Sequence, residues 1–182
     1  MTCVNQVFRG TFSLPANMKF HEIIQPVSHP GIINHYHSSR PHMHSLKCKG
    51  KWTLLLFSSG KFRIMGPIMN VDAVIDFVLG LLPRRTSLSE SPVLQTETFT
   101  FSIGRSINLY LFKKSNQADR LIQYEPELFS ALRLLYWSPI NVNVFHTGKI
   151  VVMGAKSREL LPTIYDYVNT LFSCTSQFTY LI

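Results

Sequence analysis

Five histidines crowd one short stretch of the chain, and their spacing comes nearest to that of a metal site. They are His29, His35, His37, His42 and His44. Two intervals have the form His-x-His, and on a strand both imidazoles of such a pair share one face, a spacing that zinc or copper can use. No carboxylate or paired cysteine joins them, only the single Cys48. A metal site and a polar, pH-sensitive loop are both open interpretations, and we favour the loop, with no metal.

The sequence contains no pattern that points to catalysis. It has no Gly-rich phosphate loop, no H-E-x-x-H, no G-x-S-x-G and no paired carboxylates in an apolar setting. Asp76 and Asp166 occupy equivalent helix positions and are interpreted as solvated. Cys3, Cys48 and Cys174 lie too far apart for a zinc spacing or a closed disulfide set, which is typical of a reducing compartment. We therefore expect no enzyme activity and no cofactor.

The charge balance is basic. Among 182 residues, 18 Lys and Arg stand against 10 Asp and Glu, a net charge of +8 and a pI near 9.6. Such a balance favours nucleic acid or an anionic surface as partner, because counterions are released from neutralised phosphates. No apolar run approaches the roughly 20 residues that span a bilayer, and the N-terminal residues do not have the pattern of a secretory signal. We expect no membrane association.

One pattern occurs twice along the chain. Residues 57–66, FSSGKFRIMG, align with residues 145–154, FHTGKIVVMG, at an offset of 88. Shorter matches precede and follow this block in the same order, with offsets of 88 to 90. A pattern that keeps its order over half a chain predicts a duplicated structural unit. We place the two copies at residues 1–86 and 87–182.

Each copy predicts the same elements. A strand (52–57 or 141–145) enters a tight Gly-Lys turn, and a second strand follows (62–65 or 150–153). An amphipathic helix then closes each unit, since apolar residues recur at helical spacing. These residues are Val71, Val74, Ile75, Val78 and Leu82 in the first copy, and Leu160, Leu161, Ile164, Tyr167, Val168 and Leu171 in the second. The pattern predicts an α+β fold with an antiparallel sheet and helices on one face.

Two details of this organisation are also predicted. Asp72 is expected to cap the first closing helix or to lie in its first turn, where an acid complements the helix dipole. The segment 83–92, PRRTSLSESP, is expected to be a linker between the copies.

The second copy resembles a repeat of the TATA-box-binding-protein family. The resemblance rests on YEPELF at residues 124–129, FHTGK at 145–149 and MGAK at 153–156. The stretch LLLFSSGK at 54–61 resembles the first repeat of that family more weakly. The resemblance covers nearly the whole chain. It implies a saddle of two pseudo-symmetric repeats forming a curved ten-stranded antiparallel sheet, with helices on the convex face.

The resemblance also implies a mode of DNA binding. In the family the concave sheet face lies in a widened minor groove, and pairs of phenylalanines unstack base steps at each end. Phe129 and Phe145 match both wedges of the second repeat, and Phe57 matches one of the first. Pro41 stands where the fourth wedge is expected, with Met43 the nearest apolar substitute. Without the resemblance, a phenylalanine on a strand is more often a core residue.

The remaining groove-facing positions of the family depart from its pattern in part. Lys61, Lys149 and Lys156 match basic positions near phosphates. The other matched positions are Leu55, Val151, Arg63, Asn143, Met65 and Met153. Methionines stand in place of two central threonines, and Arg9 and Thr98 in place of two central asparagines. Kinking of AT-rich or deformable DNA is therefore expected to survive more readily than strict TATA preference.

A partner site is implied by the same hexapeptide. In the family, the positions of Glu125, Glu127 and Leu128 lie on the stirrup where transcription factor IIB docks, and two carboxylates suit a basic partner. The resemblance further implies other preinitiation-complex components as partners and a location in the nucleus. A plainer interpretation is that both acids favour a helix N-terminus, with Pro126 at its first position. The alternative function is an interaction module that keeps the fold but no longer bends DNA and sequesters or reroutes transcription machinery.

Overall fold

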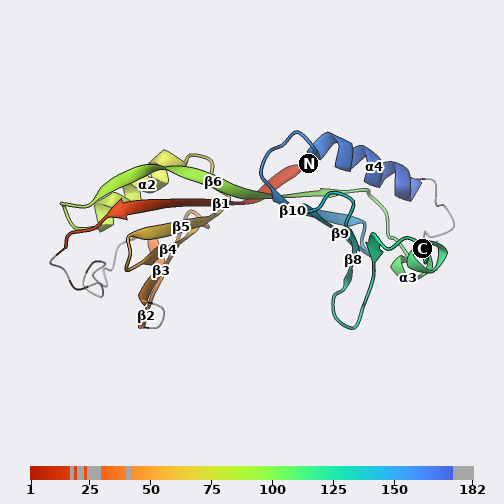
Figure 1. Ribbon diagram of the computed structural model, residues 1–182, viewed down its shortest axis with the longest axis horizontal. Coiled ribbons are helices and arrows are strands. Elements are labelled where there is room, and N and C mark those ends of the chain that lie inside the picture. The colour runs from red at the N-terminus through yellow and green to blue at the C-terminus, as the bar shows by residue number, and fades with distance from the viewer. Residues whose placement is uncertain (17–18, 20–22, 24–29, 40–41, 174–182) are drawn as a thin grey trace. The chain divides into compact units, whose positions relative to one another are not determined.

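The structure, a computed structural model, describes residues 1–16, 19, 23, 30–39 and 42–173. Its strands form a ten-stranded sheet in the order β2-β3-β4-β5-β1-β6-β10-β9-β8-β7 (Figure 1). Contacts divide the chain into a first unit, Asn5–Gln95, and a second unit, Met1–Val4 with Thr96–Ile182. The predicted α+β fold with a ten-stranded sheet is confirmed.

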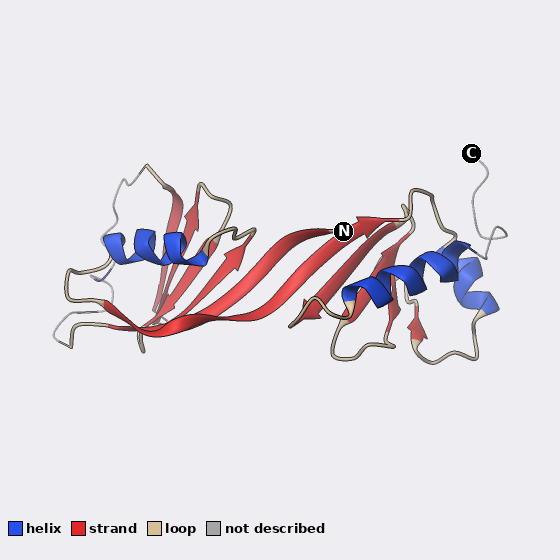
Figure 2. Ribbon diagram, turned by 90° about the horizontal axis from the view of Figure 1, so that it is seen from above, coloured by secondary structure: helices blue, strands red, loops and turns tan. Residues whose placement is uncertain are grey.

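The first unit is an antiparallel sheet covered by one described helix on one face (Figure 2). Its strands pair as β2-β3, β3-β4, β4-β5 and β5-β1. The elements are β1 (Thr2–Ser13), β2 (Ile32–Ser39), β3 (His42–Cys48), β4 (Thr53–Phe57), β5 (Lys61–Gly66) and α2 (Val71–Leu81).

The second unit repeats this arrangement, with its helices again on one face of the strands. Its strands pair as β6-β10, β10-β9, β9-β8 and β8-β7, all antiparallel. The elements are β6 (Ser87–Ser102), α3 (Leu109–Ser115), β7 (Ile122–Gln123), β8 (Ala131–Leu134), β9 (Asn141–Phe145), β10 (Lys149–Ala155) and α4 (Leu161–Ser173).

The predicted strands and closing helices are present. α2 begins after Asn70, whose side chain accepts a hydrogen bond from the Ala73 amide at 3.1 Å, so Asn70 is the cap and Asp72 is an acid of the first turn. The linker prediction is wrong for most of its length. Residues 87–92 belong to β6, a strand of 16 residues, so only the few residues after Leu82 form a connecting turn.

Strand alternation separates a core face from an open face in each unit. In β4, Leu54 and Leu56 are fully buried while Leu55 and Phe57 point the other way. In β9, Val142 and Val144 are buried in the same phase, and Asn143 between them is buried on the other face. The buried residues pack against the helix of their own unit and form one apolar cluster per unit. The face away from the helices is therefore left for binding.

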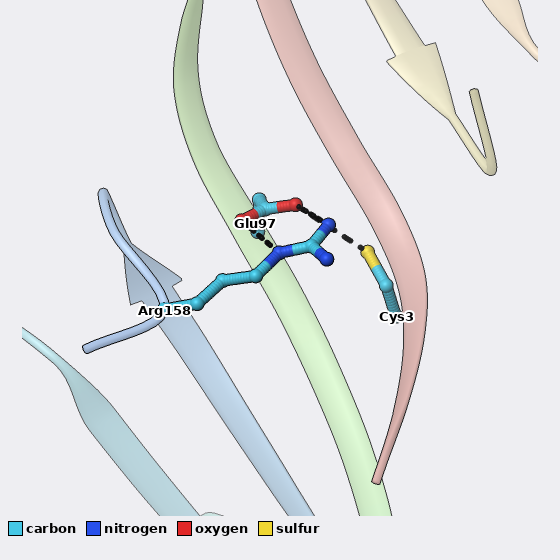
Figure 3. Close-up of polar contacts among 3 residues, drawn as sticks. All are labelled: Cys3, Glu97 and Arg158. Atoms are coloured by element: carbon cyan, nitrogen blue, oxygen red, sulfur yellow. Dashed lines mark hydrogen bonds and ion pairs between the residues drawn. The ribbon is translucent and has the colours of Figure 1, made fainter. Parts of the chain in front are cut away.

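One charged residue of the second unit lies on the core side of its strand. Glu97 of β6 is 2% exposed, and Arg158 reaches it with Nη2 at 2.8 Å from Oε1 and Nε at 3.3 Å from Oε2 (Figure 3). The thiol of Cys3 lies 3.9 Å from the same carboxylate. Hydrogen bonding and charge attraction from Glu97 raise the pKa of Arg158. The contact links β6 and β1 to the chain before α4.

Candidate nucleic-acid interface

The open face of the second unit carries the two predicted wedges side by side. The rings of Phe129 and Phe145 meet edge to face with centroids 6.2 Å apart, and both side chains are half-buried. Phe145 lies opposite Ala131 in the β8-β9 register, so the small side chain leaves room for the ring. The structure thus brings these two phenylalanines together on the face away from the helices.

The open face of the first unit carries the single predicted wedge, Phe57. Its cross-strand partner in the β3-β4 register is Met43, which is half-buried. Met43 is therefore placed to substitute for a second ring, as expected from the sequence. Pro41, the position aligned with the missing wedge, lies outside the described residues.

The two units differ in which strand of one equivalent pair carries the polar side chain. Leu55 faces Arg63 in the β4-β5 register, and Asn143 faces Val151 in the equivalent β9-β10 register. Each pair holds one apolar and one polar side chain. In the first unit the polar side chain, Arg63, is on β5, the later strand of the pair. In the second unit the polar side chain, Asn143, is on β9, the earlier strand. Asn143 is only 3% exposed, whereas Arg63 is exposed.

The methionines occupy equivalent positions on the same faces. Met65 lies between Val7 and Thr53 in register, and Met153 lies between Thr98 and Asn141. Met153 is 37% exposed, which is unusual for a residue of this size on a strand. Neither methionine belongs to an apolar core cluster.

The predicted basic residues are all exposed. Lys61 and Lys149 follow Gly60 and Gly148, whose φ values of +81° and +79° and close approach to backbone oxygens admit no side chain. These turns fix where each lysine leaves the sheet. Lys156 follows the end of β10.

The predicted partner residues form an exposed turn. Leu128 is 81% exposed, and Glu125 and Glu127 are exposed beside it. The amides of Leu128 and Phe129 donate to the carbonyl of Glu125 at 3.0 and 2.9 Å, so this is one turn and not a helix. The interpretation of the two acids as a helix N-terminus is therefore wrong.

Arg133 and Arg9 lie on the same open faces and were not among the predicted site residues. Arg133 faces Asn143 in register and places its guanidinium 5.0 Å from the centre of the Phe129 ring. Arg9 faces Arg63 in the β1-β5 register. Strand alternation extended to β1 and β8 would have found both. In the first unit, Arg9 and Arg63 help to line a hollow of about 750 Å³.

The histidine segment forms strands, so the expectation of a loop is wrong for β2 and β3. His44 is fully buried and makes a 2.9 Å ring-to-ring hydrogen bond with His35, and the ring centroid of His37 lies 4.8 Å from that of His44. Burial and the neighbouring His37 lower the pKa of His35, and burial raises the pKa of Cys48 to about 11. Within the described part of the chain, no three ligand-type residues are grouped to hold a metal; His29 lies outside that part.

The fold and the open strand faces together define a class of protein, a two-repeat α+β protein. In each repeat, the strand face opposite the helices is open and bears aromatic, apolar and basic side chains. In the described residues, no helix has the length and apolarity needed to cross a bilayer.

Comparisons with known proteins show which family the chain is similar to. Residues 91–173 match the family model described as "Transcription factor TFIID (or TATA-binding protein, TBP)". A TATA-box-binding protein of Pyrococcus horikoshii is 35% identical over 115 residues, covering 59% of this chain and 58% of that protein. A TATA-box-binding protein of Pyrodictium occultum is 27% identical over 126 residues, covering 67% and 61%. The matches thus span 58% and 61% of the length of these relatives.

A solved structure has the same fold. The Methanococcus jannaschii TBP superimposes with a TM-score of 0.72 and 22% identity, over 96% of this chain and 98% of that one. The family match, the relatives and the shared fold agree with one another. The family model covers the second half of the chain, and together the comparisons support a protein of the TATA-binding-protein family.

Proposed function

We propose that this protein is a transcription factor that binds double-stranded DNA through its open strand faces and bends it by inserting Phe57, Phe129 and Phe145 into the minor groove. The observation that carries the proposal is the ring pair of Phe129 and Phe145, 6.2 Å apart on the face away from the helices. Apolar wedges of this kind unstack base steps at a cost of a few kcal/mol, which wrapped contacts offset.

The side chains around the wedges support the same proposal. Lys61, Lys149 and Lys156 are exposed and can neutralise phosphates. Arg133 stacks on Phe129 and so restrains that ring before DNA arrives. Leu55, Val151, Met65 and Met153 supply apolar contacts to sugars and base edges, while Arg63 supplies hydrogen-bond donors. Asn143 occupies a matched position but is only 3% exposed in the free protein. Deformable AT-rich steps are the expected sites.

We also propose that the exposed turn with Glu125, Glu127 and Leu128 docks a basic initiation factor of the transcription factor IIB type. An 81% exposed leucine preceded by two carboxylates on a short turn has no evident role in stability. A partner with a basic groove would cover the leucine and pair with both acids. Other initiation factors would assemble on the same complex, in the nucleus or nucleoid where the DNA lies.

Bending is tested with Phe129→Ala combined with Phe145→Ala. Energy transfer between the ends of a duplex of about 20 base pairs should fall to the value of free DNA, because the wedges are gone. The fold should persist, since half-buried rings contribute less than the ~3–5 kcal/mol of fully buried ones. Tyr110→Ala, which removes a 66% exposed ring from α3, is the control and should bend DNA normally.

Two other outcomes have clear meanings. Collapse of the double variant, seen as loss of its unfolding transition, would show that the rings are core residues. Absence of bending by the unaltered protein at any salt concentration would favour the alternative, an interaction module that engages transcription machinery without bending DNA. The sequence features that favour this alternative are Pro41, Arg63, Asn143, Met65 and Met153, which stand in place of the side chains expected in the family.

A further inference from the structure

Two arginines lie directly opposite each other on the open face of the first unit. Arg9 of β1 pairs with Arg63 of β5 in an antiparallel register, and both side chains are exposed. On one face of such a pair, opposed Cβ atoms lie about 4.5–5.5 Å apart. The flanking pairs, Phe8 with Ile64 and Gly10 with Phe62, point to the core side.

The core fixes this register. The Phe62 ring lies over Gly10, where an added Cβ would be 2.4 Å from the ring, and it stacks on Phe12 with centroids 4.4 Å apart. A shift by one residue would move Phe62 out of the core and both arginines into it. The two guanidinium groups are therefore held on the same face by apolar packing beneath them.

The pair is electrostatically unfavourable in the free protein. Like charges directly opposite on a sheet are destabilising, and no ion pair neutralises either arginine among the residues that the structure describes. Both arginines line the hollow of about 750 Å³, together with Lys61, His42 and the exposed acid Glu90. Three permanent cations against one acid give this hollow a net positive charge. An anionic ligand would relieve the repulsion.

We propose that Arg9 and Arg63 form a paired guanidinium site that reads the minor groove of AT-rich DNA; this inference rests on the proposed function. A·T pairs offer only acceptors in the minor groove, adenine N3 and thymine O2, whereas guanine adds an N2 amino donor. Guanidinium groups donate but do not accept, so A·T pairs fit them and G·C pairs do not. The high negative potential of a narrow AT-rich groove adds to the attraction.

The surroundings of the pair favour a duplex as the ligand over an acidic peptide. Leu55 lies opposite Arg63, and the Val7–Met65 pair lies two residues along the strands on the same face; together they form an apolar strip next to the guanidinium groups. A strip of this kind suits sugars and base edges, while the charges suit groove acceptors and phosphates. The first unit then recognises DNA mainly through arginine donors, and the second through aromatic wedges.

The test uses Arg9→Gln combined with Arg63→Gln, with Arg84→Gln combined with Arg85→Gln as the control. The control removes the same charge from two exposed arginines in the turn after α2, away from the open face. Binding is measured over a salt series to three duplexes of equal length, with A·T, G·C or inosine·C pairs at the variable positions. Inosine lacks the minor-groove amino group but keeps the major-groove pattern of guanine.

The unaltered protein and the control should bind the A·T and inosine·C duplexes better than the G·C duplex. The Arg9/Arg63 variant should lose roughly tenfold of this discrimination, and its salt slope should fall by about 1–2. Without DNA, its unfolding midpoint should be equal to or higher than that of the control, because the repulsion is gone.

Three results would overturn the inference. Discrimination and salt slope equal to those of the control would show that the pair does not read the groove, even if DNA is still bent through Phe129 and Phe145. Loss of binding to a polyglutamate peptide with unchanged duplex binding would assign the pair to a protein ligand. Absence of duplex binding by the unaltered protein would remove the proposed function and this inference together.

Discussion

The Glu97 carboxylate on β6 points to the helix side of its sheet, and the ion pair with Arg158 stabilises it there. A buried carboxylate costs several kcal/mol unless it is paired and hydrogen-bonded. Here both oxygens accept hydrogen bonds from one guanidinium, which also lies 5.5 Å from the Phe99 ring. Because 64% of the Arg158 side chain is exposed, solvent screens part of the interaction.

Removing the partner should therefore cost stability. Arg158→Ala should lower the free energy of unfolding by about 1–3 kcal/mol in urea denaturation, because the Glu97 carboxylate stays buried without its donors. Arg158→Lys should fall between, since lysine keeps the charge but not the two-point geometry. The exposed Arg120→Ala is the control and should change stability by less than about 0.5 kcal/mol. Equal effects of Arg158→Ala and Arg120→Ala would mean that the ion pair contributes nothing.

Sequence patterns predicted the positions of some of these side chains and not of others. Phe57, Phe129 and Phe145 could be predicted because each stands in a repeated or specific motif. Glu97 could not, since its partner is 61 residues away and only the folded sheet brings them together. Arg9 was visible only as a substitution, and its relation to Arg63 depends on a register that composition does not specify.

At the scale of elements, β1 packs closely against Phe62 of β5 because Gly10 has no side chain. Gly10 leaves room for the tip of the Phe62 ring against the strand, and Phe62 is 1% exposed and stacked on Phe12. Gly80 lies in α2, where an added Cβ would meet nothing within 4 Å. The packing of this unit therefore requires a glycine at position 10 but not at position 80.

The same substitution should act in opposite directions at these positions. Gly10→Ala should lower the free energy of unfolding by about 1–3 kcal/mol, because the buried ring must shift. Gly80→Ala should raise it by about 0.5–1 kcal/mol, because alanine reduces the entropy lost on forming the helix. Thermal or urea unfolding of the two variants measures both effects. A stabilising or neutral Gly10→Ala would show that Phe62 has room to move and does not fix the register.

Elements with strong local signals were predicted and those with weak ones were not. β4, β5, β9, β10, α2 and α4 have apolar periodicity and turn glycines, and they occur where expected. The segment 83–92 is rich in Ser and Pro and locally resembles a loop. Its later part is nevertheless a strand, because ladder pairing with distant strands outweighs local preference in a sheet.

At the scale of the whole molecule, the proposed function requires DNA and a protein partner to bind at once. The DNA side chains lie on open strand faces, and Glu125, Glu127 and Leu128 lie on an exposed turn. Phe129 follows this turn directly, and its ring contacts Phe145 on the proposed DNA face. A partner docked on the turn would sit next to a bent segment of duplex.

Charge reversal separates the two activities. Glu125→Arg with Glu127→Arg should abolish binding of a transcription factor IIB-type protein to the DNA complex and leave DNA bending intact. Asp76→Arg with Asp166→Arg makes the same charge change on exposed helix positions and should retain the partner. Gel shift of the ternary complex measures both. Retention of the partner by the Glu125/Glu127 variant would remove the turn from the docking site.

The duplication itself was evident from the sequence because the offset of 88 to 90 residues runs through the whole chain. The sheet order could not be read from the residues alone. It entered through the family resemblance, and the structure then gave the strand pairs and registers.

Under the proposed function, the exchange between Leu55–Arg63 and Asn143–Val151 has a consequence for the direction in which DNA is read. A protein with two identical repeats would see the same duplex in either orientation and would need a palindrome to bind well. Here one repeat offers an exposed arginine where the other offers valine. The preferred binding site should therefore be non-palindromic, and the bound protein should mark one strand direction as downstream.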